Sequence, residues 1–358
     1  MNAETIQARV QDLRRRLPQL RVAGLILTQP ADVTYLTAFF GHDAWAFVTK
    51  NAVYLITDSR YIEQAEKECP RARLVLRQGP ITAAAGKLVN KLKSIKKIAV
   101  DNAVSVAAHN ALRKHLNIPL KTVDAPLATA RSIKDRTETA AIRTAAGIAA
   151  KALAKAKSFF KPGVTEIELA GRLDMEMRRL ASRNAFETIV AFGPNASRPH
   201  HQPGRRKLGK TDTILIDFGA VHKGYCCDIT RCFAIGRPSA AYRRAYGILE
   251  RAQAAAIAIT KPGAKLAEVD AAARAVIRDS GLPVYGHGSG HGIGLDVHES
   301  PFLKQDTQDR LQTGQILTIE PGIYVPGKFG IRLEDDILIA NTGRRILTKN
   351  CPHEALSI

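Results

Sequence analysis

The sequence lacks the features that mark membrane-spanning, exported and disulfide-bonded proteins. No apolar run approaches the roughly 20 residues that a membrane-spanning helix needs, and the charged start MNAETIQARVQDLRRRL has no apolar core of the kind found in signal peptides. The five cysteines are odd in number and show no CxxC spacing, so they predict no disulfide framework and fit a reducing compartment. We therefore expect a cytoplasmic protein with no membrane association.

Acidic residues are in deficit, because 53 Lys and Arg residues stand against 33 Asp and Glu residues and leave a net charge of +20. Such a balance favours nucleic-acid binding where the basic residues are clustered. Here they are spread, with 19 basic and 10 acidic side chains over residues 1–130 and 34 and 23 over residues 131–358. No basic arm, zinc-finger spacing or aromatic RNA-binding motif concentrates the charge. We expect no direct nucleic-acid function.

The length of 358 residues favours two domains, and the first third has its own α/β pattern. No Gly-rich phosphate loop follows any of its expected strands, so the pattern predicts no nucleotide site. From about residue 131 the pattern changes to a long Ala-rich helix, which predicts domains at 1–130 and 131–358. In the first domain we expect strands within 22–28, 46–57 (with a turn at Lys50–Asn51), 72–77 and 97–101, and helices at 4–16, 60–68, 84–95 and 104–115.

The second domain contains an internal repeat. KPGVTEIELAGRLD begins at Lys161 and KPGAKLAEVDAAARAVIRD begins at Lys261, and each follows a helical segment. Thr165 and Glu168 have the spacing of a helix-capping box. Each copy is followed by a β-rich stretch with two carboxylates, so we interpret the domain as a duplication.

The first carboxylate pair lies in TDTILIDFGAVHKGYCCDITRCF, which has the pattern of a hairpin. A turn centred on His222 and Lys223 would place Asp217 opposite Asp228, about 5 Å apart, where like charges repel. Three arrangements remain open: the pair shares a proton, a multivalent cation lies between the two, or a bulge separates them.

The second pair lies in ILTIEPGIYVPGKFGIRLEDDILIA. A reversal centred on Gly327 would place Glu320 opposite Glu334, and strand alternation puts Arg332 on the same face as Glu334. The alternative is a solvated acidic turn. Two hairpins that both bring carboxylates together, one in each copy of the repeat, favour a joint site.

The segment GHGSGHGIGLDVHE holds His287, His291 and His298 among glycines. Four carboxylates suit two divalent cations, and one imidazole completes a mixed nitrogen and oxygen site of the kind that takes Mn, Co, Zn or Fe. A zincin HExxH motif is excluded, because the residue four after His298 is Phe302.

Together, LIDFGA, CDITR, GHGSGHGIGLDVHE, TIEPGIYV and IRLEDD closely resemble the pita-bread metallopeptidases, the superfamily of methionine aminopeptidase, Xaa-Pro aminopeptidase, prolidase and creatinase. The resemblance covers essentially the whole chain, and TDSRYIEQA at residues 57–65 resembles the proline-specific branch. It implies an α+β protein in which a smaller α/β creatinase-like N-terminal domain precedes a pita-bread catalytic domain with an internal pseudo-two-fold duplication.

The resemblance also implies roles for individual residues. Asp228 and Glu334 would bridge two divalent metal ions, for which manganese is the expected identity and cobalt, zinc and iron are the alternatives. Glu320 would in addition carry a proton to the leaving nitrogen. The full implied ligand set is Asp217, Asp228, His291, Glu320 and Glu334, and the implied substrate-facing and supporting residues are His200, His287, His298 and Arg332.

The implied activity is that of an Xaa-Pro aminopeptidase, in which a metal-bridged hydroxide attacks the carbonyl carbon before proline. Two alternatives stay open: an Xaa-Pro dipeptidase, for which Lys304 or Arg310 would have to capture a free carboxylate, and a non-catalytic pita-bread binding protein. The partners implied are proline-containing peptides and a second copy of the chain in a homodimer. Cys226 shares the face of Asp228 by strand alternation, which raises a redox role against simple packing.

Overall fold

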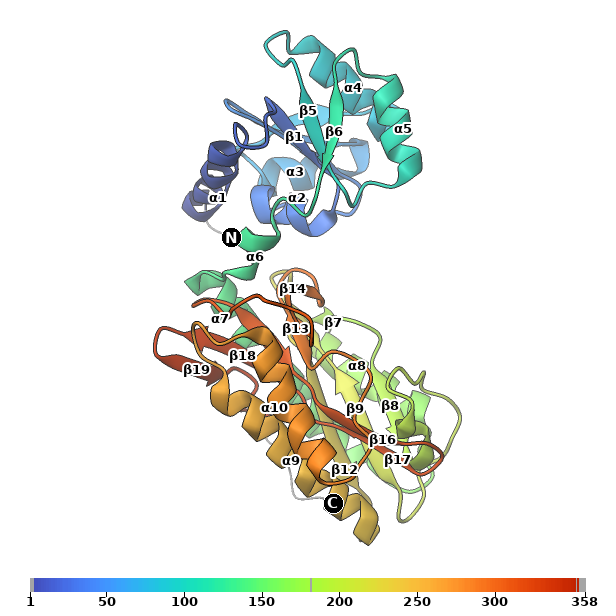
Figure 1. Cartoon of the computed structure of the whole chain (residues 1–358). Coiled ribbons are helices and arrows are strands. Elements are labelled where there is room, and N and C mark those ends of the chain that lie inside the picture. The colour runs from blue at the N-terminus through green and yellow to red at the C-terminus, as the bar shows by residue number, and fades with distance from the viewer. Residues whose placement is uncertain (1–2, 181, 352, 354–358) are drawn as a thin grey trace. The chain divides into compact units, whose positions relative to one another are not determined.

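The computed structural model describes residues 3–180, 182–351 and 353, which separate into two compact units between Arg131 and Ser132 (Figure 1). Within these described residues, no helix combines the length and the apolar character needed to cross a bilayer. Each unit has its own sheets, helices and buried core, so the two are described separately.

The first unit is built on a six-stranded sheet in the order β4-β3-β2-β1-β5-β6. The hairpin of β2 and β3 turns at Lys50–Asn51, as predicted, because Val48 pairs with Val53. All four expected strand regions are confirmed, but α2, β6 and α6 were missed. The elements are α1 (Ala3–Arg16), β1 (Gly24–Leu27), α2 (Pro30–Thr37), β2 (Trp45–Thr49), β3 (Val53–Thr57), η1 (Ser59–Tyr61), α3 (Ile62–Glu68), β4 (Arg73–Leu76), α4 (Ile81–Lys91), β5 (Ile98–Asp101), α5 (Val106–Lys114) and β6 (Leu120–Val123), followed by α6 (Ala128–Ser132).

The second unit contains four sheets in the described residues, in the orders β12-β9-β8, β11-β10-β7, β14-β13-β15-β18-β19 and β16-β17. Its helices are α7 (Arg136–Ala156), η2 (Lys157–Phe159), α8 (Glu166–Arg179), η3 (Gly193–Ser197), α9 (Ala240–Ile259) and α10 (Leu266–Asp279). Its strands are β7 (Arg183–Asn184), β8 (Ile189–Phe192), β9 (Thr213–Phe218), β10 (Ala220–His222), β11 (Tyr225–Cys226), β12 (Ile229–Ala234), β13 (Gly290–Gly292), β14 (Glu299–Leu303), β15 (Ile316–Ile319), β16 (Gly322–Val325), β17 (Phe329–Arg332), β18 (Asp335–Ala340) and β19 (Gly343–Ile346).

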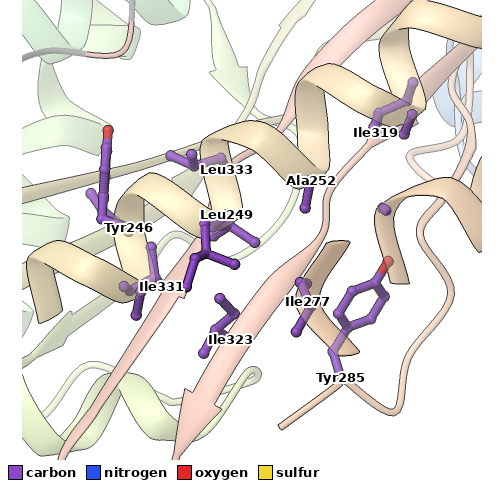
Figure 2. Close-up of a cluster of buried hydrophobic side chains, with 14 of the residues drawn as sticks. Tyr246, Leu249, Ala252, Ile277, Tyr285, Ile319, Ile323, Ile331 and Leu333 are labelled. Carbon is purple, nitrogen blue, oxygen red and sulfur yellow. The ribbon is translucent and has the colours of Figure 1, made fainter. Parts of the chain in front are cut away.

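Helix pairs cover the sheets of this unit, α7 beside α8 and α9 beside α10. The Ala-rich helix expected after residue 131 is α7, which begins at a capping box formed by Asp135 and Glu138. Figure 2 shows how α9 and α10 bury apolar side chains against the strands, with Leu249 and Ile277 directed toward Ile323 and Ile331. This packing fixes the strands from which the carboxylates project.

The internal repeat is visible in the backbone hydrogen bonds ahead of α8 and α10. The N–H of Gly163 donates to the carbonyl of Leu208, and the N–H of Gly263 donates to that of Leu311, each over 2.8 Å. The predicted α+β architecture with a duplicated second part is confirmed. We refer to residues 161–234 as the α8 half and to residues 261–340 as the α10 half.

The first hairpin differs in register from the prediction. Asp217 pairs with Thr230, so the expected direct opposition of Asp217 and Asp228 is wrong. The turn lies one residue later, at Lys223 and Gly224, which both have positive φ (50° and 84°), the conformation of a type I′ turn. Asp228 still shares the face of Asp217, because it lies two residues before Thr230 on the same strand run.

The second hairpin has the predicted register. β16 pairs with β17 around Gly327, and the register of β15 with β18 continues the same alignment. The pairs on either side therefore place Glu320 opposite Glu334 at the junction between the two ladders. Gly327 has a φ of 71°, which explains why the chain reverses there.

Candidate metal centre

A pocket of about 560 Å³ opens where the α8 half and the α10 half meet in the second unit. It collects side chains that lie up to 148 positions apart in the sequence, from Phe186 to Glu334. Every candidate site residue of the sequence analysis lines it: His200, Asp217, Asp228, His287, His291, His298, Glu320, Arg332 and Glu334.

Three of these residues form a tight cluster that could hold a metal ion. One ligand atom each from Asp228, His291 and Glu334 lies within 4.8 Å of the others, and all three side chains are buried. Glu320 lies beside them, with its Oε1 3.4 Å from Nε2 of His291. Asp217, on β9, lines the same pocket.

Three carboxylates of the pocket each have one buried oxygen without a protein hydrogen-bond partner. Asp217 Oδ1, Asp228 Oδ1 and Glu334 Oε1 are buried and accept no hydrogen bond. Burial, together with the neighbouring Glu334 carboxylate, raises the pKa of Asp228 well above its ordinary value. Burial and the carboxylate of Glu320 do the same to the pKa of Glu334. Orphaned buried oxygens beside an imidazole fit a divalent cation, because such an ion would supply the missing partner.

His291 is presented as a neutral ligand. Burial lowers its pKa to about 4, and its Nδ1 lies 3.1 Å from the carbonyl of Gly292. An Nδ1–H that donates to this carbonyl leaves the Nε2 lone pair directed at the carboxylates, which is the usual arrangement of a metal-bound histidine.

Arg332 joins the two halves of the site. It extends from the end of β17 in the α10 half and donates to Oδ2 of Asp217 in the α8 half. Its Nε donates to Oγ1 of Thr230 over 3.1 Å, and that hydroxyl donates to Oε2 of Glu334 over 2.7 Å. The planar guanidinium thus orients carboxylates from both hairpins, a geometry that lysine cannot reproduce.

His287 lies on the wall of the pocket beside the cluster. Its Nε2 is 3.0 Å from the hydroxyl of Tyr324 and its ring packs against Tyr285. The backbone at His287 is held from α10, since Arg274 donates to its carbonyl over 2.6 Å and is itself paired with Asp270 over 2.7 Å.

His200 and His298 are both exposed at the pocket surface. The ring of His298 makes an edge contact with that of His291, with centroids 4.2 Å apart. His201, which the sequence analysis did not single out, is buried and lies 2.9 Å from Glu166. Burial alone would raise the pKa of Glu166, but its hydrogen bonds outweigh this effect and lower it.

Arg231 supports the cluster from behind. This buried side chain donates to the carbonyl of Glu334 over 2.6 Å and pairs with Asp335 over 2.7 Å. Its Nε also donates to the carbonyl of Cys351 over 2.7 Å, so the last described stretch of chain is attached directly behind the carboxylates.

Three residues considered in the sequence analysis lie outside the pocket lining. Lys304 and Arg310 do not line the pocket, and Arg310 donates instead to the carbonyl of Gly263. Cys226 packs in an apolar cluster with Ile142 and Ile293, and burial raises the pKa of its thiol to about 12. Packing therefore explains Cys226 without a redox role.

Sequence reasoning missed Tyr324, Thr230 and Glu166. Alternation could have found the first two, because Tyr324 is four residues after Glu320 and Thr230 is two residues after Asp228. No periodic pattern links Glu166 to its partners, which lie 26 to 38 residues further along the chain.

Comparison with known proteins places this geometry in a family. Residues 140–341 match Metallopeptidase family M24, and residues 9–133 match the Creatinase/Prolidase N-terminal domain. An uncharacterized peptidase of Bacillus subtilis is 34% identical over 344 residues, which cover 95% of this chain and 97% of that protein. The structure of an Xaa-Pro dipeptidase from Bacillus anthracis superimposes with a TM-score of 0.94 at 32% identity, covering 99% and 100% of the two chains. That of an X-Pro aminopeptidase from Thermotoga maritima gives 0.88 at 33% identity, covering 96% and 100%.

Proposed function

The chain belongs to metallopeptidase family M24, and we propose that it is a metal-dependent, proline-specific exopeptidase that releases the N-terminal residue from peptides with proline in second position. The observation that carries the aminopeptidase assignment is the charge of the pocket. Among its described lining residues, Arg332 is the one Lys or Arg side chain, and its guanidinium is already bonded to Asp217. Among these lining residues, the free carboxylate of a dipeptide therefore has no Lys or Arg partner that is not already bonded to another carboxylate. A longer peptide has no carboxylate at that position and does not require such a partner.

The proposed metal ligands are Asp217, Asp228, His291, Glu320 and Glu334, holding two divalent ions, with manganese as the expected metal. When bound, such ions polarise a carbonyl and lower the pKa of water. The chain's own groups do the rest of the work. Glu320, whose pKa burial raises to about 7 in the metal-free protein, is suited to hold a proton and release it to the leaving nitrogen.

The histidines are proposed to bind and orient the substrate. His200 and His298 project from opposite halves into the pocket and can donate to the scissile amide, a contact worth roughly 2.7–4 kcal/mol in the transition state. His287 is fixed through Tyr324 and Arg274, which suits a group that orients the residue after the scissile bond. A bond to proline offers no N–H, so a site for it must rely on carbonyl contacts of this kind.

The dipeptidase remains a second candidate, supported by the similarity to the Xaa-Pro dipeptidase from Bacillus anthracis. Metal-stripped protein reconstituted with Mn, Co or Zn should be given an Xaa-Pro dipeptide and an Xaa-Pro-Xaa tripeptide. We expect release of the first residue from the tripeptide, abolished in Glu320→Ala and His291→Ala. Cleavage of the dipeptide alone would assign the dipeptidase, and cleavage of neither by metal-loaded protein would favour a binding protein.

The homodimer and the cytoplasmic location also stay predictions. Light scattering of the purified chain tests the first, and a mass near twice 38.9 kDa is the expected result. The high positive charge is proposed to be unrelated to nucleic acid. A salt-sensitive affinity for DNA or RNA that survives metal removal would contradict this.

A further inference from the structure

The wall of the pocket that carries His200 has little regular structure of its own. Between the end of β8 at Phe192 and Gly204, the chain forms η3 and then an irregular stretch. Five consecutive residues of that stretch, 199–203, line the pocket. Irregular backbone is held by specific hydrogen bonds rather than by a ladder, so the bonds that reach this loop from other elements bear on its shape.

Glu166 holds both ends of this loop. It is the first residue of α8, and its side chain is fully buried. Oε1 accepts from the Phe192 N–H and from Nδ2 of Asn195, each over 2.8 Å. Oε2 accepts from the Gly204 N–H over 3.1 Å and lies 2.9 Å from Nε2 of His201. One carboxylate therefore bonds the start of the loop with one oxygen and the end of the loop with the other.

A second tether acts between those ends. Nη1 of Arg332 donates to the carbonyl of Pro199 over 3.2 Å. His200 thus lies between two restrained neighbours, Pro199 and His201, while its own ring is exposed to the pocket.

We propose that Glu166 is a positioning residue for His200: it closes the loop of residues 192–204 and so sets where the His200 ring meets a peptide. The proposal rests on the proposed peptidase function for its catalytic consequence, although the loop anchoring itself does not. Glu166 is not among the described residues that line the pocket, so we expect its effect to pass through the loop.

The alternative is that Glu166 only stabilises α8, since a carboxylate in the first turn interacts favourably with the helix dipole. Glu168 provides a matched control. It lies in the same turn, caps the same helix through the N–H and hydroxyl of Thr165, and is absent from the pocket lining. Glu168→Gln therefore removes the same charge from the same helix end without touching the loop.

The first test is a double-mutant cycle on the metal-loaded enzyme with the Xaa-Pro-Xaa tripeptide. Glu166→Gln keeps the side-chain size but replaces one of the two accepting oxygens with an amide donor. We expect it to lower kcat/KM about 10- to 100-fold with metal content unchanged, and Glu168→Gln to change it less than about 2-fold. In a His200→Ala background, Glu166→Gln should lower kcat/KM by less than about 3-fold further, because the two residues act as one unit. An equal loss in both backgrounds would overturn the proposal.

The second test needs no activity. Hydrogen-exchange mass spectrometry should show faster exchange of the amides of residues 192–204 in Glu166→Gln than in the wild type. In Glu168→Gln the exchange of the same amides should be unchanged. Asn195→Ala, which removes one of the four bonds, should give a smaller acceleration in the same peptides and serves if Glu166→Gln does not fold. Unchanged exchange in both loop variants would overturn the proposal whatever the activity. Faster exchange in a chain that cleaves neither substrate would support the anchoring and reject the proposed function.

Discussion

The α8 half and the α10 half bring two carboxylates each to the same pocket, but with different side chains and different registers. In the α8 half the short side chains of Asp217 and Asp228 are staggered along the hairpin, because Asp217 pairs with Thr230. In the α10 half the longer side chains of Glu320 and Glu334 lie opposite each other. What the halves share is a common polar face, so a duplicated scaffold can keep a site while its strand register changes.

The helices that follow the Lys-Pro-Gly repeat differ more. α8 begins with buried Glu166, which binds the loop of His200, whereas the corresponding residue of α10 is Leu266, which packs in the apolar core. The α10 half instead anchors its histidine segment from the middle of the helix, through Asp270 and Arg274. The two halves therefore hold their histidine segments from different positions on equivalent helices.

Single substitutions of one carboxylate in either half are expected to have the largest effect on activity. Asp228→Asn and Glu334→Gln should each lose bound metal and lower kcat/KM by at least about 1000-fold, since both groups belong to the cluster with His291. Metal content by mass spectrometry and tripeptide hydrolysis measure this. The exposed Glu268→Gln is the control and should match the wild type. Full metal and full activity in either variant would remove that half from the centre.

The pH dependence of the metal-free protein tests whether carboxylates of both halves are buried in one site. Burial raises the pKa of Glu320 to about 7, and the pKa values of Asp228 and Glu334 are also raised. The folded state then binds more protons than the unfolded state, so stability is lost as pH rises from about 4.5 through 7. For Glu320 alone this amounts to about 3 kcal/mol.

Thermal unfolding of chelator-treated protein should therefore show a lower Tm at about pH 8 than at about pH 5.5, and saturating manganese should restore the loss. Glu320→Gln should reduce the slope. The same slope with and without metal would mean that the carboxylates do not meet as described.

Arg332→Lys tests the connection between the halves. Lysine keeps the charge but cannot bond Asp217, Thr230 and Pro199 together, so we expect kcat to fall about 10- to 100-fold while metal binding weakens less than in the ligand variants. Arg344→Lys, on exposed β19, is the matched control and should leave kcat within about 2-fold. Equal rates for both variants would show that the halves are aligned without Arg332.

The smallest expected effects concern the helix starts. Thr165 and Glu168 form a capping box on α8, whereas Lys265 gives α10 no side-chain cap. Thr165→Ala should lower the free energy of unfolding by about 1 kcal/mol, and Lys265→Ser should raise it by about 0.5 kcal/mol. Urea unfolding of the metal-loaded protein measures both, and opposite signs are the expected result. A lower free energy of unfolding in both variants would mean that Lys265 has a stabilising role of its own.

The fold and most of the site could be predicted because hairpins carry their register locally. Pro326-Gly327-Lys328 allows one obvious reversal, and the register of the second pair follows from it. His222-Lys223-Gly224 allows two, and the structure uses the one that places Gly224, with a φ of 84°, at the second central position of the turn. The missed α2 is buried on nearly all sides and so has no amphipathic pattern.

Residues that act across distance in the chain could not be predicted in the same way. Glu166 is predicted only as part of a helix start, because its partners in the His200 loop meet it through the tertiary fold. Arg332, in contrast, shares a strand face with Glu334, and alternation was enough to place it near the carboxylates. Contacts within one hairpin can thus be predicted from the sequence, and contacts between a helix end and a remote loop cannot.

The bond from Arg231 to the carbonyl of Cys351 has a consequence for the timing of synthesis. A ribosome delivers residue 231 long before residue 351, and the support behind Glu334 is incomplete until the later segment has emerged. The carboxylates of both hairpins, all at positions before 335, are therefore synthesised before the residue that completes this contact behind them.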